Sequence, residues 1–317
     1  MFMNEPVTRR GFVGKASFAL GGLAAVSTSA VAVPASSGKP RSFNFSLNAG
    51  TILGHKLTLP EQIEVTAKAG YAGFEPWLRD IAKFLETGGS LKDLRKRCDD
   101  VGLKIVGGIG FTQWIVNDDA VRAKGIEQLK KEIEQLAQLG APQFAAPPAG
   151  MTKPDVKLDL NAAAERYRVI LELGKQGGVV PMLEIWGASA NISTLAEALY
   201  ITAKAGHPDA CILADIYHIY KGGNLPDSVR QLSPSATRVF HMNDYPATPT
   251  RDTIKDSDRI WPGDGIAPIK QILSSLAENG CTPWLSLELF NQEYYKLPAL
   301  EAAKTGLAKM KAAAALG

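Results

Sequence analysis

The chain has 317 residues, of which 45% are hydrophobic and 21% are charged, so it can bury a core and is not intrinsically disordered. Its 30 glycines and 19 prolines follow no repeat, which excludes a collagen-like or low-complexity sequence. A formal net charge of +3 is too small at this length to indicate a nucleic-acid-binding surface or stable membrane association.

The excess positive charge is concentrated at the start of the chain. Residues 1–32 contain three basic residues and one acid, so the remaining 285 residues carry a net charge of only +1. An arginine pair, Arg9 and Arg10, precedes a weakly apolar run that ends in Ala30-Val31-Ala32 and is too short and polar to predict a membrane span. The segment resembles a twin-arginine export signal. This resemblance implies export in folded form, by the twin-arginine translocation machinery, to the periplasm or outside the cell.

Residues 33–42 have the composition of a polar linker, and we expect residues 43–317 to form one catalytic domain. Three cysteines are an odd number and too few for a disulfide framework. We therefore expect Cys98, Cys211 and Cys281 to be buried free thiols, which fits a protein that folds before export.

From Phe43 onward, short runs of strand-forming residues alternate with longer segments of helical period. The predicted strands are Phe43–Leu47, Gly73–Trp77, Leu103–Gly108, Pro142–Ala146, Val180–Ile185, Cys211–Asp215, Arg238–Met242 and Trp284–Leu289. The predicted helices are Leu59–Ala69, Leu91–Val101, Val121–Leu139, Ala162–Gln176, Ser193–Ala205, Ala267–Glu278 and Leu297–Ala315, with a short one around Asp227–Leu232.

Eight strand–helix units in this length predict an α/β fold, a (β/α)8 TIM barrel. The alternative is a doubly wound parallel sheet, but the first strand runs into Asn48-Ala49-Gly50-Thr51 and no glycine-rich dinucleotide-binding turn follows it. The barrel is favoured, and it requires catalytic residues at the carboxyl ends of the strands.

Four ionisable residues occupy the carboxyl ends of consecutive predicted strands, namely Glu184, Asp215, His241 and Glu288. Any one of them alone is best explained as a hydrogen-bonded polar group inside the barrel. Together, three carboxylates and one imidazole predict a site for one divalent metal ion. Mn²⁺ is favoured, and Mg²⁺, Co²⁺ and Zn²⁺ are alternatives.

These residues resemble the metal site of the xylose isomerase-like barrels, specifically the sugar phosphate isomerase/epimerase group that includes the ketose 3-epimerases. The family pattern matches Glu184, Asp215 with His218 three residues later, His241 and Glu288, and the turn at residues 261–265 is also similar. The resemblance implies that Glu184 and Glu288 bind the metal and act as catalytic base and acid. It further implies that Asp215 and His241 are ligands, and that His218, on the loop after its strand, binds substrate.

The sequence departs from the epimerase pattern at two positions. Epimerases usually carry a second glutamate six residues after the strand-five glutamate and an arginine six residues after the strand-seven histidine. This chain has Ala190 and Ala247 there, and Asn191, Arg251 and Arg259 are candidates to replace the missing groups. Ketose 3-epimerase activity itself is therefore in question.

Several other residues are candidate substrate contacts. Tryptophans at strand ends or in the following loops, namely Trp77, Trp114, Trp186 and Trp261, predict a platform for a sugar ring. Arg259 is a further candidate. Glu75, near the end of the second strand, is equally compatible with a hydrogen bond to a metal ligand and with a substrate contact.

The resulting hypothesis is a metal-dependent isomerase or epimerase that moves a proton next to the carbonyl of a non-phosphorylated keto sugar. The alternative is a lyase or dehydratase acting on a 3-keto glycoside or an inosose after the same first step. An abasic-site endonuclease-like hydrolase is disfavoured, because its zinc cluster is rich in histidine and this chain has four histidines. A non-catalytic sugar-binding protein would need no metal. The sequence leaves open whether the chain forms a homo-oligomer.

Overall fold

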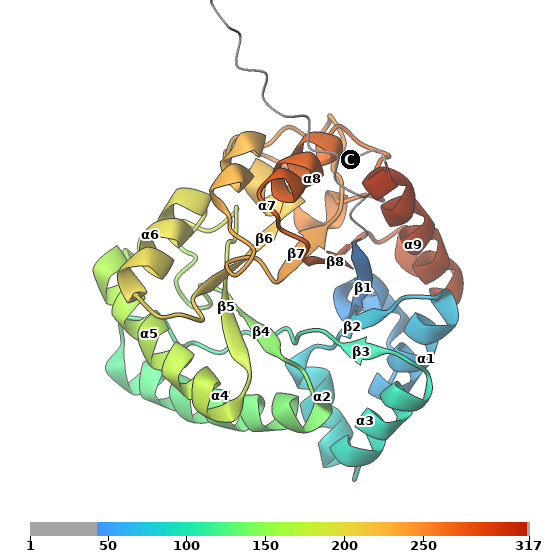
Figure 1. Ribbon diagram of the computed structural model, residues 1–317, viewed down its shortest axis with the longest axis horizontal. Helices are drawn as coiled ribbons and strands as arrows, with labels where there is room; N and C mark the ends of the chain where they lie inside the picture. Colours follow the sequence, from blue (N-terminus) through green and yellow to red (C-terminus); the bar gives the residue numbers. More distant parts are fainter. Residues whose placement is uncertain (1–42, 316–317) are drawn as a thin grey trace, which may run out of the picture. The chain divides into compact units, whose positions relative to one another are not determined.

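The computed structural model describes residues 43–315 (Figure 1). The expected export signal over residues 1–32 and the linker over residues 33–42 lie outside the described residues. Eight parallel strands stand at the centre and helices surround them, which confirms the predicted TIM barrel (Figure 1). Across the described residues, no helix is at once long and apolar enough to cross a membrane.

The strands are short, and all but β1, which ends one residue later than predicted, lie within the predicted ranges. They are β1 (Asn44–Asn48), β2 (Gly73–Glu75), β3 (Lys104–Ile105), β4 (Gln143–Ala146), β5 (Val180–Glu184), β6 (Cys211–Asp215), β7 (Val239–Met242) and β8 (Trp284–Leu287). Their order in the sheet is β3-β2-β1-β8-β7-β6-β5-β4. A parallel bridge between Ile109 and Ala145 joins the β3 side to β4 and closes the barrel.

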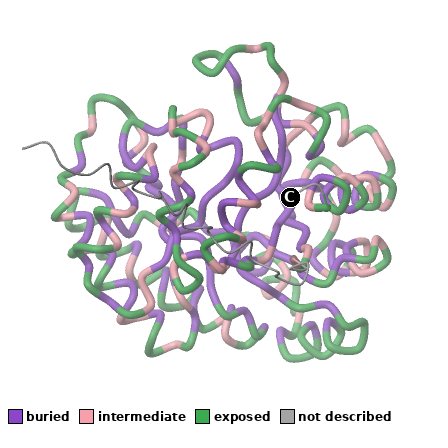
Figure 2. Tube along the Cα trace, turned by 45° about the horizontal axis from the view of Figure 1, so that its top comes forward, coloured by how far each residue is buried: buried purple, intermediate pink, exposed green. Residues whose placement is uncertain are grey.

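The outer layer contains the helices α1 (Leu59–Ala69), α2 (Leu78–Glu86), α3 (Leu91–Asp100), α4 (Asp119–Leu139), α5 (Leu160–Gly177), α6 (Leu195–Ala205), α7 (Ile216–Lys221), α8 (Ile269–Glu278) and α9 (Ala299–Ala315). Short 3₁₀ turns are η1 (Ala49–His55), η2 (Pro226–Gln231), η3 (Asp256–Asp258) and η4 (Tyr294–Lys296). Buried residues follow the strands and the inner faces of the helices, while the outer faces are exposed (Figure 2).

Local sequence explains where the main helices begin and end. Asp118 accepts hydrogen bonds from the backbone N–H groups of Ala120 and Val121, both at 2.9 Å, and so starts α4. Thr194 and Glu197 form a capping box at the start of α6. Gly140 ends α4 in the left-handed conformation, with φ of 80°, which costs a glycine little.

Two helices were not predicted. The sequence favours one helix after the second strand, but α2 and α3 both occur there. After β6, α7 begins directly at Ile216 and is followed by η2 close to the expected short helix. His218 therefore lies on a helix, and its expected position on a loop was wrong.

The three cysteines are buried thiols, as expected for a protein without a disulfide framework. Cys98 packs on α3, Cys211 begins β6 and Cys281 precedes β8. Burial raises the pKa of the Cys98 thiol to about 11, which keeps it protonated at neutral pH.

The long segment between β7 and α8 is held by one buried carboxylate, that of Asp244. Its two oxygens accept hydrogen bonds from four backbone N–H groups, at 2.7 to 3.0 Å, donated by Tyr245, Gly263, Gly265 and Ala267. The backbone of Asp244 also pairs with that of Ile260 in an antiparallel bridge. This carboxylate therefore fixes the path of the segment that carries Arg259.

We expect Asp244→Ala to lower the free energy of unfolding by roughly 3 kcal/mol or more, because it leaves several backbone donors unpaired. Urea unfolding followed by circular dichroism measures this loss. Asp252→Ala is the matched control, since the Asp252 side chain is 85% exposed in the same segment. Equal stability of the two variants would contradict the role given to Asp244.

Candidate active site

A cavity of about 490 Å³ opens at the carboxyl ends of the strands, where a TIM barrel places its active site. Side chains from the end of β5 and from the segments that follow β2 to β8 line it. The lining residues are Trp77, Ile109, Phe111, Thr152, Glu184, Trp186, Ala188, Ser189, His218, Asp256, Arg259, Glu288 and Phe290. Charged groups and aromatic rings therefore share one cavity.

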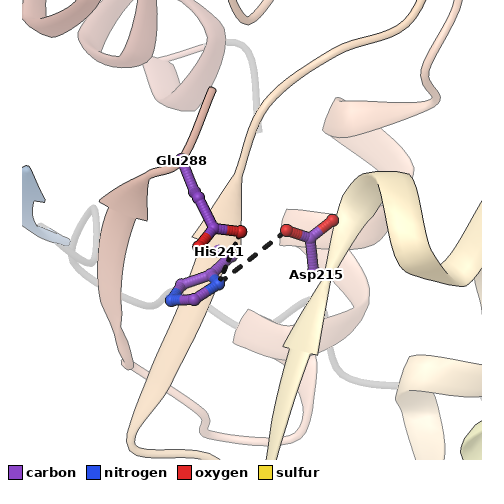
Figure 3. Close-up of side chains that lie close together, drawn as sticks. All are labelled: Asp215, His241 and Glu288. Atoms are coloured by element: carbon purple, nitrogen blue, oxygen red, sulfur yellow. Dashed lines mark ion pairs between the residues drawn. The ribbon is translucent and has the colours of Figure 1, made fainter. Parts of the chain in front are cut away.

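Three of the four expected metal ligands form a tight buried group: Asp215, His241 and Glu288 (Figure 3). Nδ1 of His241 lies 3.3 Å from Oε2 of Glu288 and 3.8 Å from Oδ2 of Asp215. Their potential ligand atoms all lie within 4.8 Å of one another. The fourth, Glu184, lines the same cavity from the end of β5 but is not part of this tight group.

The strand register explains this convergence. Asp215 of β6 is paired with His241 of β7, and His241 with Ser286 of β8, two residues before Glu288. Residues two apart on a strand point to the same face, so these side chains project into the barrel at adjacent levels. Their charges are tolerable inside the barrel only because they face one another.

The pKa values of the two catalytic candidates, Glu184 and Glu288, are shifted in opposite directions. Burial, followed by the negative charge of Glu288, raises the pKa of Glu184 to about 8. Burial alone would also raise the pKa of Glu288, but the positive charges of His241 and Arg259 outweigh it and hold that pKa well below its usual range. Of the two carboxyl groups in this cavity, Glu184 therefore binds a proton more strongly than Glu288 does in the absence of a metal ion.

The donor set fits a divalent ion. Oε2 of Glu184 and Nδ1 of His241 are buried and make no hydrogen bond with any described residue. Buried polar atoms without partners are costly, and an ion would satisfy both. Three carboxylates and one imidazole suit Mn²⁺, Mg²⁺, Co²⁺ and Zn²⁺ alike, so the donors do not select among these metals.

Two asparagines that sequence reasoning missed orient the ligands. Asn48, the last residue of β1, donates from Nδ2 to Oε1 of Glu288 at 3.0 Å and accepts from Trp77 Nε1 at 3.1 Å. Asn243, just after β7, donates from Nδ2 to Oδ2 of Asp215 at 3.0 Å. Their positions at strand ends are the only signal that the sequence offered.

Arg259 reaches the centre of the site from the segment after β7. Its side chain is 1% exposed, and Nη1 donates to Glu288 Oε2 at 2.9 Å and to Asp215 Oδ2 at 3.1 Å. Nη2 pairs with Asp256. Burial alone would lower the pKa of Arg259, but the carboxylates of Asp215, Asp256 and Glu288 outweigh it and raise that pKa. Arg259 therefore stays charged and partly neutralises the acidic cluster.

The other two candidate replacements do not reach the site. Asn191 is bound to backbone groups, donating to Met151 and Val156 and accepting from Leu158. Arg251 is half exposed and lies beside Asp252. Of the three candidates for the missing epimerase groups, Arg259 alone enters the cavity.

His218 lines the cavity from the first turn of α7. Its Nδ1 accepts from the backbone N–H of Gly187 at 3.2 Å, and its Nε2 lies 3.1 Å from Nη2 of Arg259. Burial and then the charge of Arg259 lower the pKa of His218, so the ring is neutral at pH 7. A guanidinium can only donate, so both ring nitrogens face donors and the neutral ring accepts from one of them at a time.

The tryptophans divide into two groups. Trp77 and Trp186 line the cavity, together with Phe111 and Phe290, which sequence reasoning missed. Phe111 lies 5.2 Å from Trp77 and 6.0 Å from Trp186, measured between ring centroids, and is 44% exposed.

Three expected substrate contacts lie outside the cavity lining. Trp114 is 1% exposed and donates to the carbonyl of Pro147 at 3.0 Å, so it packs in the core. Trp261 stacks on Tyr294 with ring centroids 4.0 Å apart. Glu75 is fully buried and its Oε2 lies 3.2 Å from Nε2 of His241, so it contacts a ligand candidate and not the cavity.

Comparison with known proteins identifies the family to which the chain belongs. A family model described as xylose isomerase-like TIM barrel matches residues 63–313. The chain belongs to this family. Curated relatives of the chain include isomerases and dehydratases, so the chain is a member of an enzyme family whose reactions differ.

Two curated relatives illustrate this range. An inosose isomerase of Halalkalibacterium halodurans is 30% identical over 190 residues, which cover 59% of this chain and 67% of the relative. A 3-dehydroshikimate dehydratase of Pseudomonas putida is 23% identical over 252 residues, covering 79% of this chain but 39% of that longer protein.

A solved structure of an IolI protein with a bound zinc atom has the same fold. It aligns with a TM-score of 0.78 at 24% identity and covers 86% of this chain and 98% of that one. That protein is described with a zinc atom, and this chain has a buried Asp–His–Glu group of its own.

We expect the purified protein to hold one divalent ion per chain and to lose activity when a chelator removes it. Equilibrium dialysis followed by elemental analysis measures the ion, and adding back Mn²⁺, Mg²⁺, Co²⁺ or Zn²⁺ tests which one restores turnover. A chain that binds no divalent ion and keeps its activity would contradict the metal site.

Proposed function

We propose that the protein is a metal-dependent isomerase or epimerase that transfers a proton next to the carbonyl of a non-phosphorylated polyhydroxy ketone. The observation that carries this proposal is the pair of carboxyl groups that line the cavity. Glu184 ends β5 and Glu288 directly follows β8, and their pKa values are shifted in opposite directions. Such a pair suits the removal of a proton and its return.

Five residues of the site have roles in this reaction. Asp215, His241, Glu288 and Glu184 would hold the ion, which supplies charge stabilisation for the oxygen of the carbonyl. Glu184, whose Oε2 has no hydrogen-bond partner among the described residues, is in its ionised form the stronger base of the two carboxylates, and in that form it takes the proton from the carbon next to the carbonyl. In an isomerisation Glu184 returns this proton to the neighbouring carbon, and in an epimerisation Glu288 takes up a proton before it delivers one to the other face. His218, which lines the cavity, contacts a substrate hydroxyl.

The charge of the cavity favours a substrate without a phosphate group. Among the described residues, Arg259 and His218 are the basic side chains that line it. Arg259 is already paired with three carboxylates and His218 is neutral. Apart from the ion, a phosphate monoester would therefore meet no unpaired cation among the described residues of the lining. The proposed export signal agrees, because sugar phosphates are mainly cytoplasmic.

A lyase or dehydratase is the second candidate, and two observations favour it. The chain is similar to 3-dehydroshikimate dehydratases over 79% of its length. The cavity volume of about 490 Å³ also lies within the range that holds drug-sized ligands, which leaves room for a keto sugar with an attached group. After the same proton removal, a leaving group on the next carbon would depart, as from a 3-keto glycoside or an inosose.

One experiment separates these candidates. The protein with bound Mn²⁺, the ion we propose, is incubated in D₂O with inososes, keto sugars and 3-keto glycosides, and the products are followed by proton NMR. Exchange of a C–H next to the carbonyl with a new isomer supports the isomerase or epimerase. An unsaturated product supports the lyase. Absence of exchange with every ketone would contradict both.

Export remains a proposal for the segment over residues 1–32. We expect the wild-type chain in cell fractionation to be in the periplasm or the medium. Replacing the arginine pair, Arg9→Lys with Arg10→Lys, is expected to retain it in the cytoplasm, because the pair is the part of the signal that the translocation machinery reads.

A further inference from the structure

Glu75 is a buried charge that the proposed proton transfer does not use. Its side chain is completely buried at the end of β2 and is not among the residues that line the cavity. Oε2 lies 3.2 Å from Nε2 of His241, and Oε1 makes no hydrogen bond with any described residue. Burying an ionised carboxylate costs folding free energy unless the group is paired or hydrogen-bonded.

The surroundings leave this carboxylate one polar partner. Within residues 43–315, the ion pair with His241 is the one recorded for Glu75. On its other side a glycine, Gly107, gives it space, because a Cβ at that position would lie 2.7 Å from Oε1 of Glu75. Packing between the glycine and the imidazole therefore holds the carboxylate against Nε2 of His241.

The two nitrogens of His241 consequently face different groups. Nε2 faces Glu75, while Nδ1 faces Glu288 at 3.3 Å and Asp215 at 3.8 Å. Both nitrogens face carboxylates, but Nε2 makes a hydrogen bond while Nδ1 makes none with any described residue. The oxygens that face Nδ1 already accept from Arg259, so the proton of a neutral ring is best placed on Nε2, where it is donated to Glu75. The lone pair of a neutral His241 is then on Nδ1, directed at the two other ligand candidates.

We propose that Glu75 is a positioning residue that fixes the tautomer and the ring orientation of His241 for metal binding. The proposal rests on the metal site of the proposed function. Carboxylates behind ligating histidines generally contribute 10–100-fold in metal affinity or activity. Glu75 acts through His241 and touches neither the ion nor the substrate.

Two substitutions separate the hydrogen bond from the charge. Glu75→Leu removes both, and we expect it to weaken Mn²⁺ binding about 10–100-fold, measured by competition with a fluorescent chelator. Glu75→Gln keeps an acceptor oxygen but loses the charge, so its affinity is expected to lie between those of Glu75→Leu and the wild type. The matched control is Glu132→Gln, because Glu132 is a buried carboxyl group on α4 bound to Thr112 and Gln128, away from the site.

A second readout does not depend on metal binding. Long-range ¹⁵N–¹H spectra of histidine-labelled, metal-free protein report which nitrogen of His241 is protonated, with His241→Asn used to assign the signals. At a pH where the ring is neutral, we expect Nε2–H in the wild type and a mixture of tautomers in Glu75→Leu. If Glu75→Leu misfolds, Glu75→Gln serves for both measurements.

The outcomes distinguish this proposal from the proposed function. Wild-type affinity and an unchanged His241 tautomer in the Glu75 variants would overturn the positioning role. An equal loss of affinity in Glu132→Gln would overturn it too, because the effect would then not be specific to His241. Failure of the wild type to bind Mn²⁺ would overturn the metal site, and the tautomer spectra would still decide whether Glu75 sets the proton of His241.

Discussion

Glu184→Gln is expected to lower turnover about 10²–10⁴-fold, the usual contribution of a positioned general acid or base. The amide is close in shape to the carboxyl group but cannot take a proton from carbon. Asp215, His241 and Glu288 remain to hold the ion, so the metal content should fall less than the turnover. Burial raises the pKa of Glu184 to about 8, and its neutral form is therefore tolerated inside the barrel.

Solvent deuterium exchange into the substrate is the measurement that reports on this step alone. Elemental analysis and circular dichroism of the same samples check the metal and the fold. Glu165→Gln is the control, since Glu165 is exposed on α5 and the substitution makes the same chemical change. Exchange at the wild-type rate in Glu184→Gln would refute the assignment of Glu184 as the base.

The candidate site was predictable from the sequence where it depends on strand ends. Glu184, Asp215 and His241 were found because each is an ionisable residue inside an apolar strand, and such strands are easy to recognise. The barrel then required their convergence. Asn48 and Asn243 were missed because a neutral amide at a strand end looks like an ordinary turn residue.

Other parts of the site depend on long-range packing that a sequence pattern does not encode. Arg259 lies eighteen residues after His241 in an irregular segment, and the hydrogen bonds of Asp244 decide where it goes. The helix α7 has six residues, too few to show a helical period, so His218 was placed on a loop. Trp114 follows a strand as expected, yet its indole turns to Pro147 in the core.

Arg259 also stabilises the folded chain when no metal ion is bound, because its guanidinium neutralises carboxylates that are almost entirely buried. Asp215 is fully buried and Glu288 is 4% exposed, and Nη1 of Arg259 contacts both. These are the same oxygens, Oδ2 and Oε2, that face Nδ1 of His241. The arginine and a divalent ion therefore act on the same charges.

Arg259→Met is accordingly expected to lower the unfolding free energy of the metal-free protein by about 3–5 kcal/mol, the usual cost of removing one partner of a buried ion pair. Saturating Mn²⁺ should recover much of this loss, because the ion binds the folded chain and compensates the same carboxylates. Urea unfolding with and without the ion measures both effects.

The control is Arg251→Met, whose side chain is half exposed beside an exposed aspartate, and its loss should not exceed about 1 kcal/mol. The comparison between the two conditions carries the argument. A loss in Arg259→Met that is the same with and without Mn²⁺ would mean that the arginine and the ion stabilise different groups. A smaller loss with Mn²⁺ means that, in the metal-free site, Arg259 neutralises the same carboxylates that the ion neutralises when it is bound.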